Sequence, residues 1–356
     1  PRMTSKTRKV TIQKEADIIR HPLEDLMDSV KASHPGLEKL AAVAVMAVKA
    51  RQCLIVVSPP GCGKSSVTNW IATQREDAFI KDSLTRASLK AYESEWNGFT
   101  GVMLFDDVGK IDTAWSRVQT LTTMAEIVHG HFVSKDSHQL HIEIDNFHGS
   151  CILNIQPNVL GDVVSHPTWH SNLADKSMRY YHLQRATSPN RAALDYPINW
   201  GIPMDDVEEA EPEGKAWEAL MRVGMEQWTR PRTHEHLHDS LRGLAALAGR
   251  TKPTTQDMEL LLMLLQPLTV EMEVLESHGF GETVKLNVGL LYLLTEFASY
   301  PKLTYGDIAA DMRMRERKVV DILESMVEWF HKTGRAPVEL RPSPELLRVL
   351  KKAGIA

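Results

Sequence analysis

The chain has 356 residues, of which 43% are hydrophobic and 24% are charged, and its formal net charge is -5 at pH 7. This length favours two or three modules over one ordinary domain core, and the composition excludes both wholesale disorder and an overall polycation. Any contact with nucleic acid must therefore come from local basic patches.

The cysteines and the apolar runs indicate where such a chain resides. Cys53 and Cys151 lie in apolar runs and Cys62 lies in a glycine loop, which favours reduced thiols over a disulfide framework. No apolar run approaches the roughly 20 residues that span a bilayer, and the basic N-terminus is not followed by the apolar core of a secretory signal. We expect a cytoplasmic protein without membrane contact, with residues 1–22 as an N-terminal tail.

The first clear element is an alanine-rich stretch followed by the segment VVSPPGCGKSSVTNW. The alanine-rich stretch predicts a buried helix packed on a sheet. The next run, CLIVVS, is β-branched and apolar, as in a strand that is covered on both faces of a parallel sheet. The spacing of KSSVTNWIATQ is helical, so strand, loop and helix follow the order of a phosphate-binding loop.

This loop predicts a site for a nucleotide phosphate. Its glycines let the backbone curl, so that consecutive N–H groups point at phosphate oxygens next to a helix N-terminus. Lys64 would neutralise the β and γ phosphates, and Ser65 would bind Mg²⁺. Ser58 stands where the usual pattern begins with Gly. The predicted ATP-binding residues of the loop are Pro60, Gly61, Cys62, Gly63, Lys64, Ser65 and Ser66.

Two later runs predict further strands whose carboxyl ends meet the loop. GVMLFDD ends in Asp106 and Asp107. We expect Asp106 to hold Mg²⁺ and Asp107 to polarise the attacking water. Glu is commoner in the second role, so the shorter Asp107 indicates either a closer approach or slow hydrolysis. The other run, GSCILNIQPN, also ends in polar residues.

The remaining elements follow in chain order. GHFVSKDSHQLHIEID alternates apolar and polar residues around SKDSH, which predicts a β-hairpin with Lys135 exposed at its tip. Residues 187–214 are rich in Pro, Gly and acidic side chains and indicate a linker. Helical patterns over 215–280 predict a small helical domain. From 285 to 356, three helical segments and an extended run resemble a winged helix.

The second helical pattern of this group offers a specific capping prediction. Thr254 or Thr255 stands shortly before the acidic Asp257 and is a plausible N-cap.

Together, the glycine loop, the acidic strand end and the hairpin resemble those of AAA+ ATPases. The closest likeness is to the branch with a hairpin before sensor 1, which includes MCM helicases and MoxR-type ATPases. The resemblance covers roughly residues 35 to 265. It implies a P-loop α/β fold with a parallel sheet flanked by helices over 23–186, a helical lid over 215–280, and ATP with Mg²⁺ as ligands.

The resemblance also implies a polar sensor of the γ phosphate at the end of the third strand, often followed by Pro. Gln156 precedes Pro157 here, and Asn154 and Asn158 are alternatives.

Two arginines complete the implied site. Arg179, in ADKSMRYYHL, would act on the nucleotide of a neighbouring subunit, with Lys176 as the alternative. This role implies a homo-oligomeric ring, expected to be a hexamer. Arg232, in TRPRTHEHL, would be the sensor arginine of the lid, with Arg230 and Arg242 as alternatives.

Contacts with DNA are expected at two places. In the MCM-like branch the hairpin faces a central pore, so Lys135 would track a phosphate backbone, although Asp136 beside it weakens the positive field. The predicted winged helix carries the basic run MRMRERK, which could meet phosphates. Its candidate residues are Arg313, Arg315, Arg317 and Lys318.

The histidines around the hairpin match no closed zinc pattern with cysteines, so we predict no metal site there.

The predicted function is that of an ATP-hydrolysing ring motor that moves on or remodels DNA, as a helicase or translocase does. A compact chain of this kind would suit a virus, plasmid or other mobile element. One alternative is a MoxR-like chaperone that remodels a protein complex through an adaptor. Another is an ATP-switched DNA-binding or helicase-loading protein, which the short side chain of Asp107 favours.

Overall fold

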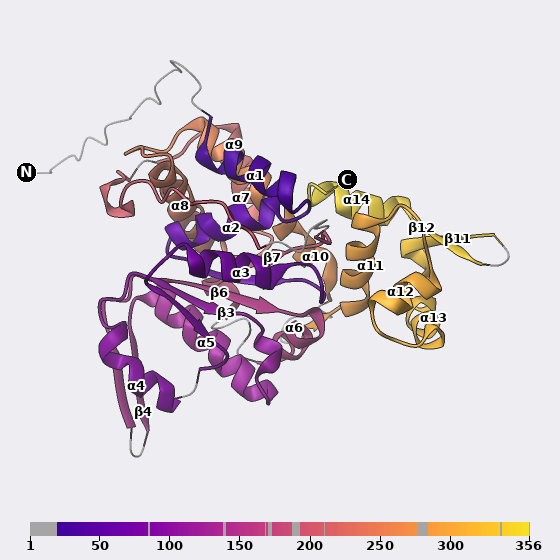
Figure 1. Cartoon of the computed structure of the whole chain (residues 1–356), viewed down its shortest axis with the longest axis horizontal. Helices are drawn as coiled ribbons and strands as arrows, with labels where there is room; N and C mark the ends of the chain where they lie inside the picture. The colour runs from indigo at the N-terminus through magenta and orange to yellow at the C-terminus, as the bar shows by residue number, and fades with distance from the viewer. Residues whose placement is uncertain are drawn as a thin grey trace, which may run out of the picture.

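A five-stranded parallel sheet organises the first half of the chain in the computed structural model (Figure 1). The structure describes residues 20–84, 86–137, 140–167, 169, 173–186, 193–209, 211–276, 284–334 and 337–355. In spatial order the strands are β2 (Ala78–Lys81), β3 (Val102–Phe105), β6 (Ser150–Ile155), β1 (Cys53–Val57) and β7 (Met178–Tyr181). The predicted parallel sheet is therefore confirmed.

The sheet is covered on both faces, as the apolar runs predict. Every residue of β1, β3, β6 and β7 is buried, whereas the edge strand β2 is partly exposed. Alternate side chains of β1 enter different cores, since Leu54 packs with one layer and Ile55 with the other. The cysteines Cys53, Cys62 and Cys151 are buried free thiols.

One face of the sheet packs against a thick helical layer. The helices of this layer are α1 (Pro22–Ser33), α2 (Glu38–Lys49), α3 (Lys64–Thr73), α7 (Lys215–Gly224), α8 (Arg230–Leu247) and α9 (Thr255–Leu265). The alanine-rich α2 is buried continuously from Leu40 to Val48, because it lies between the sheet and α8. The helices predicted as a lid thus share one hydrophobic core with the sheet. Thr254 caps α9 by accepting a hydrogen bond from the Asp257 N–H, as predicted.

The connection into these helices runs along the same layer. Residues 193–209 are tied to α3 and α2, since Trp70 Nε1 donates to the Tyr196 carbonyl at 2.9 Å and Lys49 Nζ donates to the Trp200 carbonyl at 2.6 Å.

The opposite face carries a second layer and the predicted hairpin. Its elements are α4 (Arg86–Trp96), α5 (Ala114–Gly130), α6 (Pro157–Val164) and the antiparallel strands β4 (Val133–Ser137) and β5 (Leu140–Ile144). The hairpin extends with α4 at the lower left of Figure 1. Residues 138–139, between the two strands, lie outside the described residues. Lys135 pairs with Ile142 within the ladder, so the expectation of Lys135 at the tip is wrong.

A C-terminal module, residues 288–355, lies at the right of Figure 1. Its elements are α11 (Val288–Ser299), β10 (Leu303–Thr304), α12 (Tyr305–Asp311), α13 (Glu316–Glu324), β11 (Phe330–Thr333), β12 (Glu339–Pro342) and α14 (Pro344–Lys352). The three strands form an antiparallel sheet in the order β10-β12-β11. The module thus contains the three helical segments and the extended run that the sequence predicts, and in addition the strands β10 and β11 and the helix α14.

Short elements complete the fold. The module is joined to the helical layer through α10 (Glu271–Val274) and the paired strands β8 (Leu275–Glu276) and β9 (Lys285–Leu286). Single 3-10 turns occupy Val108–Lys110, Ala174–Lys176, Met204–Asp206, Gln266–Val270 and Val327–Trp329. None of the helices in the described part of the chain has the length and apolar character that crossing a bilayer requires.

Candidate nucleotide site at the carboxyl edge of the sheet

The topology brings the predicted site residues to one edge of the sheet. β1 pairs with β6 on one side and β7 on the other, and β3 pairs with β6. Because all these strands are parallel, their carboxyl ends lie at one edge, which we call the carboxyl edge. Ligands of open α/β sheets bind at such an edge.

The glycine loop between β1 and α3 has a backbone that only glycine adopts without strain. Gly61 and Gly63 have φ angles of 80° and 81°. A Cβ atom on Gly63 would lie 2.7 Å from Leu37 Cδ2, so this glycine is also required by close packing. The hydroxyl-bearing Ser65 and Ser66 are exposed in the first turn of α3. The loop and the first turn of α3 therefore offer a helix N-terminus and two exposed serine hydroxyls to a ligand.

Lys64, the first residue of α3, is folded back onto the loop. Its Nζ donates to the Ser58 carbonyl at 2.6 Å, to Ser58 Oγ at 3.0 Å and to the Pro59 carbonyl at 3.0 Å. Burial lowers the pKa of Lys64 to about 8, while the charges of Asp107 and Asp106 act in the opposite direction. The amine is thus held at the loop in a partly desolvated position, where an anion would favour its charged form.

Asp106 and Asp107 follow β3 and differ in their partners. Asp107 Oδ1 accepts the Gly109 N–H at 2.8 Å, and its Oδ2 accepts from Gln156 Nε2 at 3.1 Å. Asp106 Oδ2 accepts from Lys110 Nζ at 3.2 Å. Asp106 Oδ1 is buried and has no hydrogen-bond partner. A buried carboxylate oxygen without a partner is costly, and it fits a site for a cation or its bound water.

The three candidates for the polar sensor occupy different places. Gln156, which precedes α6, is the one that contacts Asp107. Asn154 is buried on the other side of β6, where its Nδ2 donates to Thr68 Oγ1 at 2.7 Å. Asn158 is exposed in the first turn of α6. The geometry therefore favours Gln156 over the two asparagines.

Two residues at this edge were missed by sequence reasoning. His182 follows β7, and its Nε2 donates to the Cys62 carbonyl at 2.9 Å. Burial lowers the pKa of His182 to about 4, so the ring is neutral near pH 7. Arg185 lies nearby, with Nη1 3.7 Å from the position of a Cβ on Gly61. No strand was predicted at Met178–Tyr181, so nothing in the sequence pointed to either residue.

Arg179 is not available to a neighbouring subunit, and this prediction is wrong. The side chain is completely buried within β7 and forms an ion pair with Glu271, with 2.8 Å between Nε and Oε2. Its remaining donors reach carbonyls of the same chain, including that of Gln227 at 2.9 Å. All of its charge is thus engaged in the protein interior, so Arg179 has a structural role.

Arg232 also lies away from the glycine loop, which corrects its assignment as a sensor arginine. Its guanidinium contacts His129 near the end of α5 and Glu235 on α8. Since α5 runs back from the carboxyl edge, His129 lies near the amino ends of the strands. The exposed Arg230 begins the same helix. The alternatives Arg242 and Lys176 both line a cavity at that opposite edge, which we call the amino edge.

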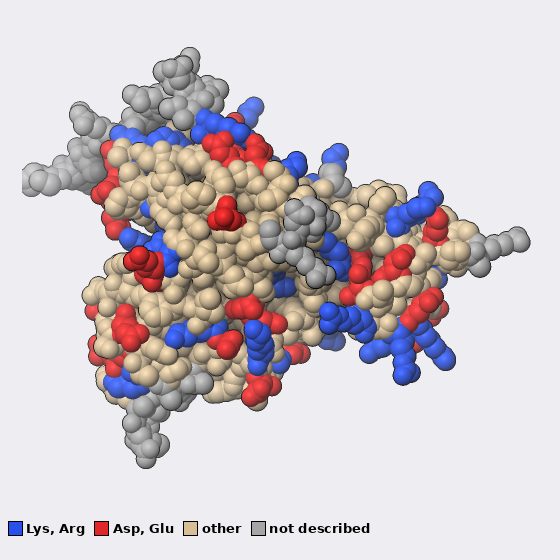
Figure 2. Space-filling model, in the orientation of Figure 1, with Lys and Arg blue, Asp and Glu red and all other residues tan. Residues whose placement is uncertain are grey.

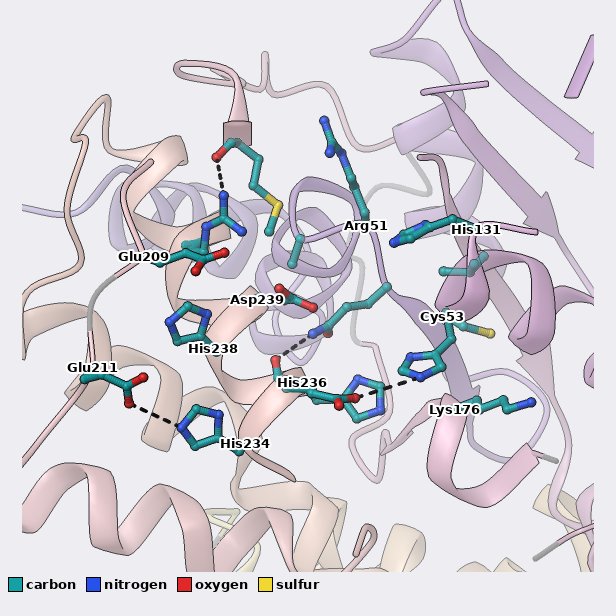
Figure 3. Close-up of a pocket in the computed structure, with 17 residues that line it drawn as sticks. Arg51, Cys53, His131, Lys176, Glu209, Glu211, His234, His236, His238 and Asp239 are labelled. Carbon is teal, nitrogen blue, oxygen red and sulfur yellow. Dashed lines mark hydrogen bonds and ion pairs between the residues drawn. The ribbon is translucent and has the colours of Figure 1, made fainter. Parts of the chain in front are cut away.

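This cavity of about 620 Å³ is rich in histidine but does not include the glycine loop (Figure 3). Its histidines are His129, His131, His234, His236 and His238. In Figure 3, His234 points to Glu211, whereas Asp239 extends from α8 toward the middle of the cavity. Burial raises the pKa of Asp239 and lowers that of His236 to about 4. Among the described residues, no three His, Cys, Asp or Glu side chains are arranged to hold a metal ion.

The predicted DNA-contacting residues of the C-terminal module form a basic group around the start of α13. Arg313, Arg315, Arg317 and Lys318 are all exposed. Figure 2 shows Lys and Arg side chains gathered over α12 and α13 at the right of the molecule. Within the described ranges none of the four forms an ion pair. Cations at a helix N-terminus oppose the helix dipole, so an external anion would stabilise this group.

Comparison of the chain with protein-family models and with curated protein sequences finds no match.

Proposed function

We propose that the protein binds ATP at the carboxyl edge and hydrolyses it. The observation that carries this proposal is the convergence of the glycine loop, Lys64 and Asp106 on one edge, with Asp106 Oδ1 buried and without a partner. A nucleotide with its metal ion would supply an anion for Lys64 and the missing partner of Asp106. No such combination of loop, amine and orphan carboxylate occurs at the cavity of the amino edge, as far as its lining residues are described.

Each residue then has a defined task. Backbone N–H groups of 61–64 would hold the phosphates, and Lys64 would leave Ser58 to neutralise them. Ser65 and Asp106 would hold Mg²⁺, which supplies positive charge against the phosphate oxygens. Asp107, oriented by Gln156, would accept the hydrogen bond of the attacking water. Pro60, Cys62 and Ser66 shape the loop.

The wider proposal is an AAA+ ATPase that acts on DNA. The C-terminal module supports it, because its order of helices and strands is that of a winged helix and α13 is the helix that would enter a groove. The cations Arg315 and Arg317 stand at the start of that helix. The helices over 215–276 would form the lid. A homo-oligomeric ring, expected as a hexamer, stays part of the proposal, with no residue now assigned to act in trans.

One observation favours the slower, switch-like alternative. Both oxygens of Asp107 already accept hydrogen bonds, from the Gly109 N–H and from Gln156. Lys64 is likewise engaged with Ser58 and Pro59. These groups must rearrange before hydrolysis, so an ATP-switched DNA-binding protein with little turnover is the second candidate.

The deciding experiment is steady-state ATPase activity of the full chain, with and without single- and double-stranded DNA, over a range of protein concentrations. A rate per subunit that rises with concentration and with DNA supports the ring motor. ATP-dependent DNA binding without turnover supports the switch. Stimulation by a protein partner alone would support the MoxR-like chaperone, and absence of ATP binding would contradict all three.

The DNA contact has its own test. In Arg315→Gln, binding to any DNA sequence should weaken uniformly, and the slope of log affinity against log salt should fall by about 1. Lys215→Gln is the matched control, since it removes the same charge from the exposed start of α7. An equal effect in the control would show that net charge, and not α13, drives binding.

A further inference from the structure

Arg185 joins the glycine loop to the C-terminal module. It follows β7 at the carboxyl edge, and its Nη1 lies 3.7 Å from the position of a Cβ on Gly61. Its neighbour Ala186 is packed as closely, with Cβ 3.1 Å from a Cβ position on Gly63. The guanidinium therefore stands at the mouth of the proposed phosphate site.

The partners of Arg185 all belong to the C-terminal module. Its Nη2 forms an ion pair with Glu296 of α11 and lies 3.7 Å from Asp311 Oδ2 at the end of α12. Its backbone N–H donates to Ser299 Oγ at 3.3 Å. A residue that follows the last strand of the sheet thus contacts two helices of the module.

This contact is only partly satisfied. Glu296 is completely buried, yet its Oε2 has no hydrogen-bond partner, and neither has Arg185 Nε. Burial raises the pKa of Glu296 to about 7; the hydrogen bond from Arg185 acts in the opposite direction, and the neighbouring Asp311 acts in the same direction as burial. One guanidinium here serves two carboxyl groups beside the phosphate site. Incompletely paired buried charges are poorly stabilised, which favours a change of partner when a better anion arrives.

We propose that Arg185 exchanges between Glu296 with Asp311 and the terminal phosphate of bound ATP, so that ATP releases α11 and α12 from the sheet. We call these three residues the Arg185 latch. The proposal rests on the nucleotide site proposed above and assigns to Arg185 the phosphate contact that Arg179 and Arg232 cannot make. Nucleotide binding is thereby coupled to the module that carries the basic start of α13.

The test combines calorimetry with hydrogen exchange of residues 288–311, using the full chain with Mg²⁺ and either ADP or the slowly hydrolysed analogue ATPγS. In the wild type, ATPγS should raise exchange in this segment and ADP should not. Glu296→Gln should raise exchange without nucleotide and tighten ATPγS binding about 10-fold, because Arg185 keeps only the more distant Asp311 as a charged partner. Arg185→Gln should weaken ATPγS about 10-fold and remove the nucleotide effect on exchange.

Two further variants protect the interpretation. Arg185→Gln could misfold because Glu296 loses its cation, whereas Arg185→Gln with Glu296→Gln leaves a neutral pair and should fold with equally weak binding. Lys352→Gln removes a different ion pair of the module, the one between Lys352 and Glu226 at 2.9 Å, and should leave ATPγS affinity unchanged.

The outcomes separate the two proposals. Wild-type affinity for ATPγS in both Arg185→Gln and Glu296→Gln would overturn the latch and leave the nucleotide site standing. A wild-type chain that binds neither nucleotide would remove the site and the latch together.

Discussion

The two edges of the sheet differ in how they use their polar residues. The amino edge has a cavity of about 620 Å³, around which His236 and Arg242 bond to backbone carbonyls of the same chain, while Arg242 Nε and Gln52 Oε1 keep no partner. At the carboxyl edge, Asp106 and Glu296 each keep a buried oxygen without a partner. Volume alone therefore does not identify a functional site. Strand direction and buried carboxylate oxygens without a partner are better guides.

The largest effect is expected for Arg179, which belongs to the structural side of this comparison. Arg179→Ala leaves Glu271 buried without its cation and should lower the free energy of unfolding by about 3–5 kcal/mol. Urea unfolding measures this, with the exposed Arg348→Ala as a control expected below about 1 kcal/mol. A variant with normal stability and lost turnover would instead restore a catalytic role for Arg179.

His182 at the carboxyl edge and His236 at the amino edge allow the two edges to be compared through the pH dependence of stability. The pKa values of His182 and His236 are lowered by burial from 6.5 to about 4, so the unfolded chain binds more protons between these values. Stability should therefore fall as the pH drops from 6.5 to 4, by about 3 kcal/mol for each ring. Unfolding of His236→Gln over this range should show a correspondingly flatter profile.

The control for this experiment is His331→Gln, at an exposed position of β11, which should keep the wild-type pH profile. His182→Gln should also disturb ATP affinity, because His182 holds the Cys62 carbonyl. Equal effects on ATP affinity from His182 and His236 would contradict the division between the edges.

Lys64 tests the nucleotide site directly. Lys64→Ala should retain the fold and lose ATP affinity by about 100-fold, since the phosphates lose their principal cation. Titration with a fluorescent ATP analogue measures the change. Glu235→Gln, at the cavity of the amino edge, is the matched control and should bind as the wild type does. The site would be misplaced if the control lost affinity and Lys64→Ala did not.

The smallest effect is expected for the metal. In Asp106→Asn, the tightening of ATP binding by Mg²⁺ should diminish by about 10-fold, while binding in EDTA should stay the same. Asp82→Asn is a suitable control, because Asp82 lies 3.9 Å from the same Lys110 but is exposed. Identical Mg²⁺ dependence in wild type and Asp106→Asn would exclude Asp106 as a ligand.

The elements that the sequence predicts well are those that depend on local patterns of apolar, polar and capping residues. The buried strand before the glycines, the hairpin and the cap at Thr254 all depend on neighbours within a few residues. The sequence also predicts that Asp106 and Asp107 lie near the glycine loop, because the carboxyl ends of parallel strands converge.

The failures concern partners that are far apart in the chain. Arg179 pairs with a residue 92 positions later and Arg185 with one 111 positions later. A local arginine followed by an aromatic residue does not reveal that β7 is buried along its length. Helical periodicity likewise predicted the helices over 215–280 but not the face of the sheet that they cover, so Arg232 was placed at the wrong edge.

The shared core of α2 and α8 limits how the chain can be divided. A fragment that stops after Ala186 would expose the side of α2 that α8 covers, where residues from Leu40 to Val48 are buried without interruption. Such a fragment would expose a continuous apolar surface on α2 and should aggregate. The phosphate-binding half of the chain should therefore not fold as an independent unit, and deletion variants should keep the chain through α9.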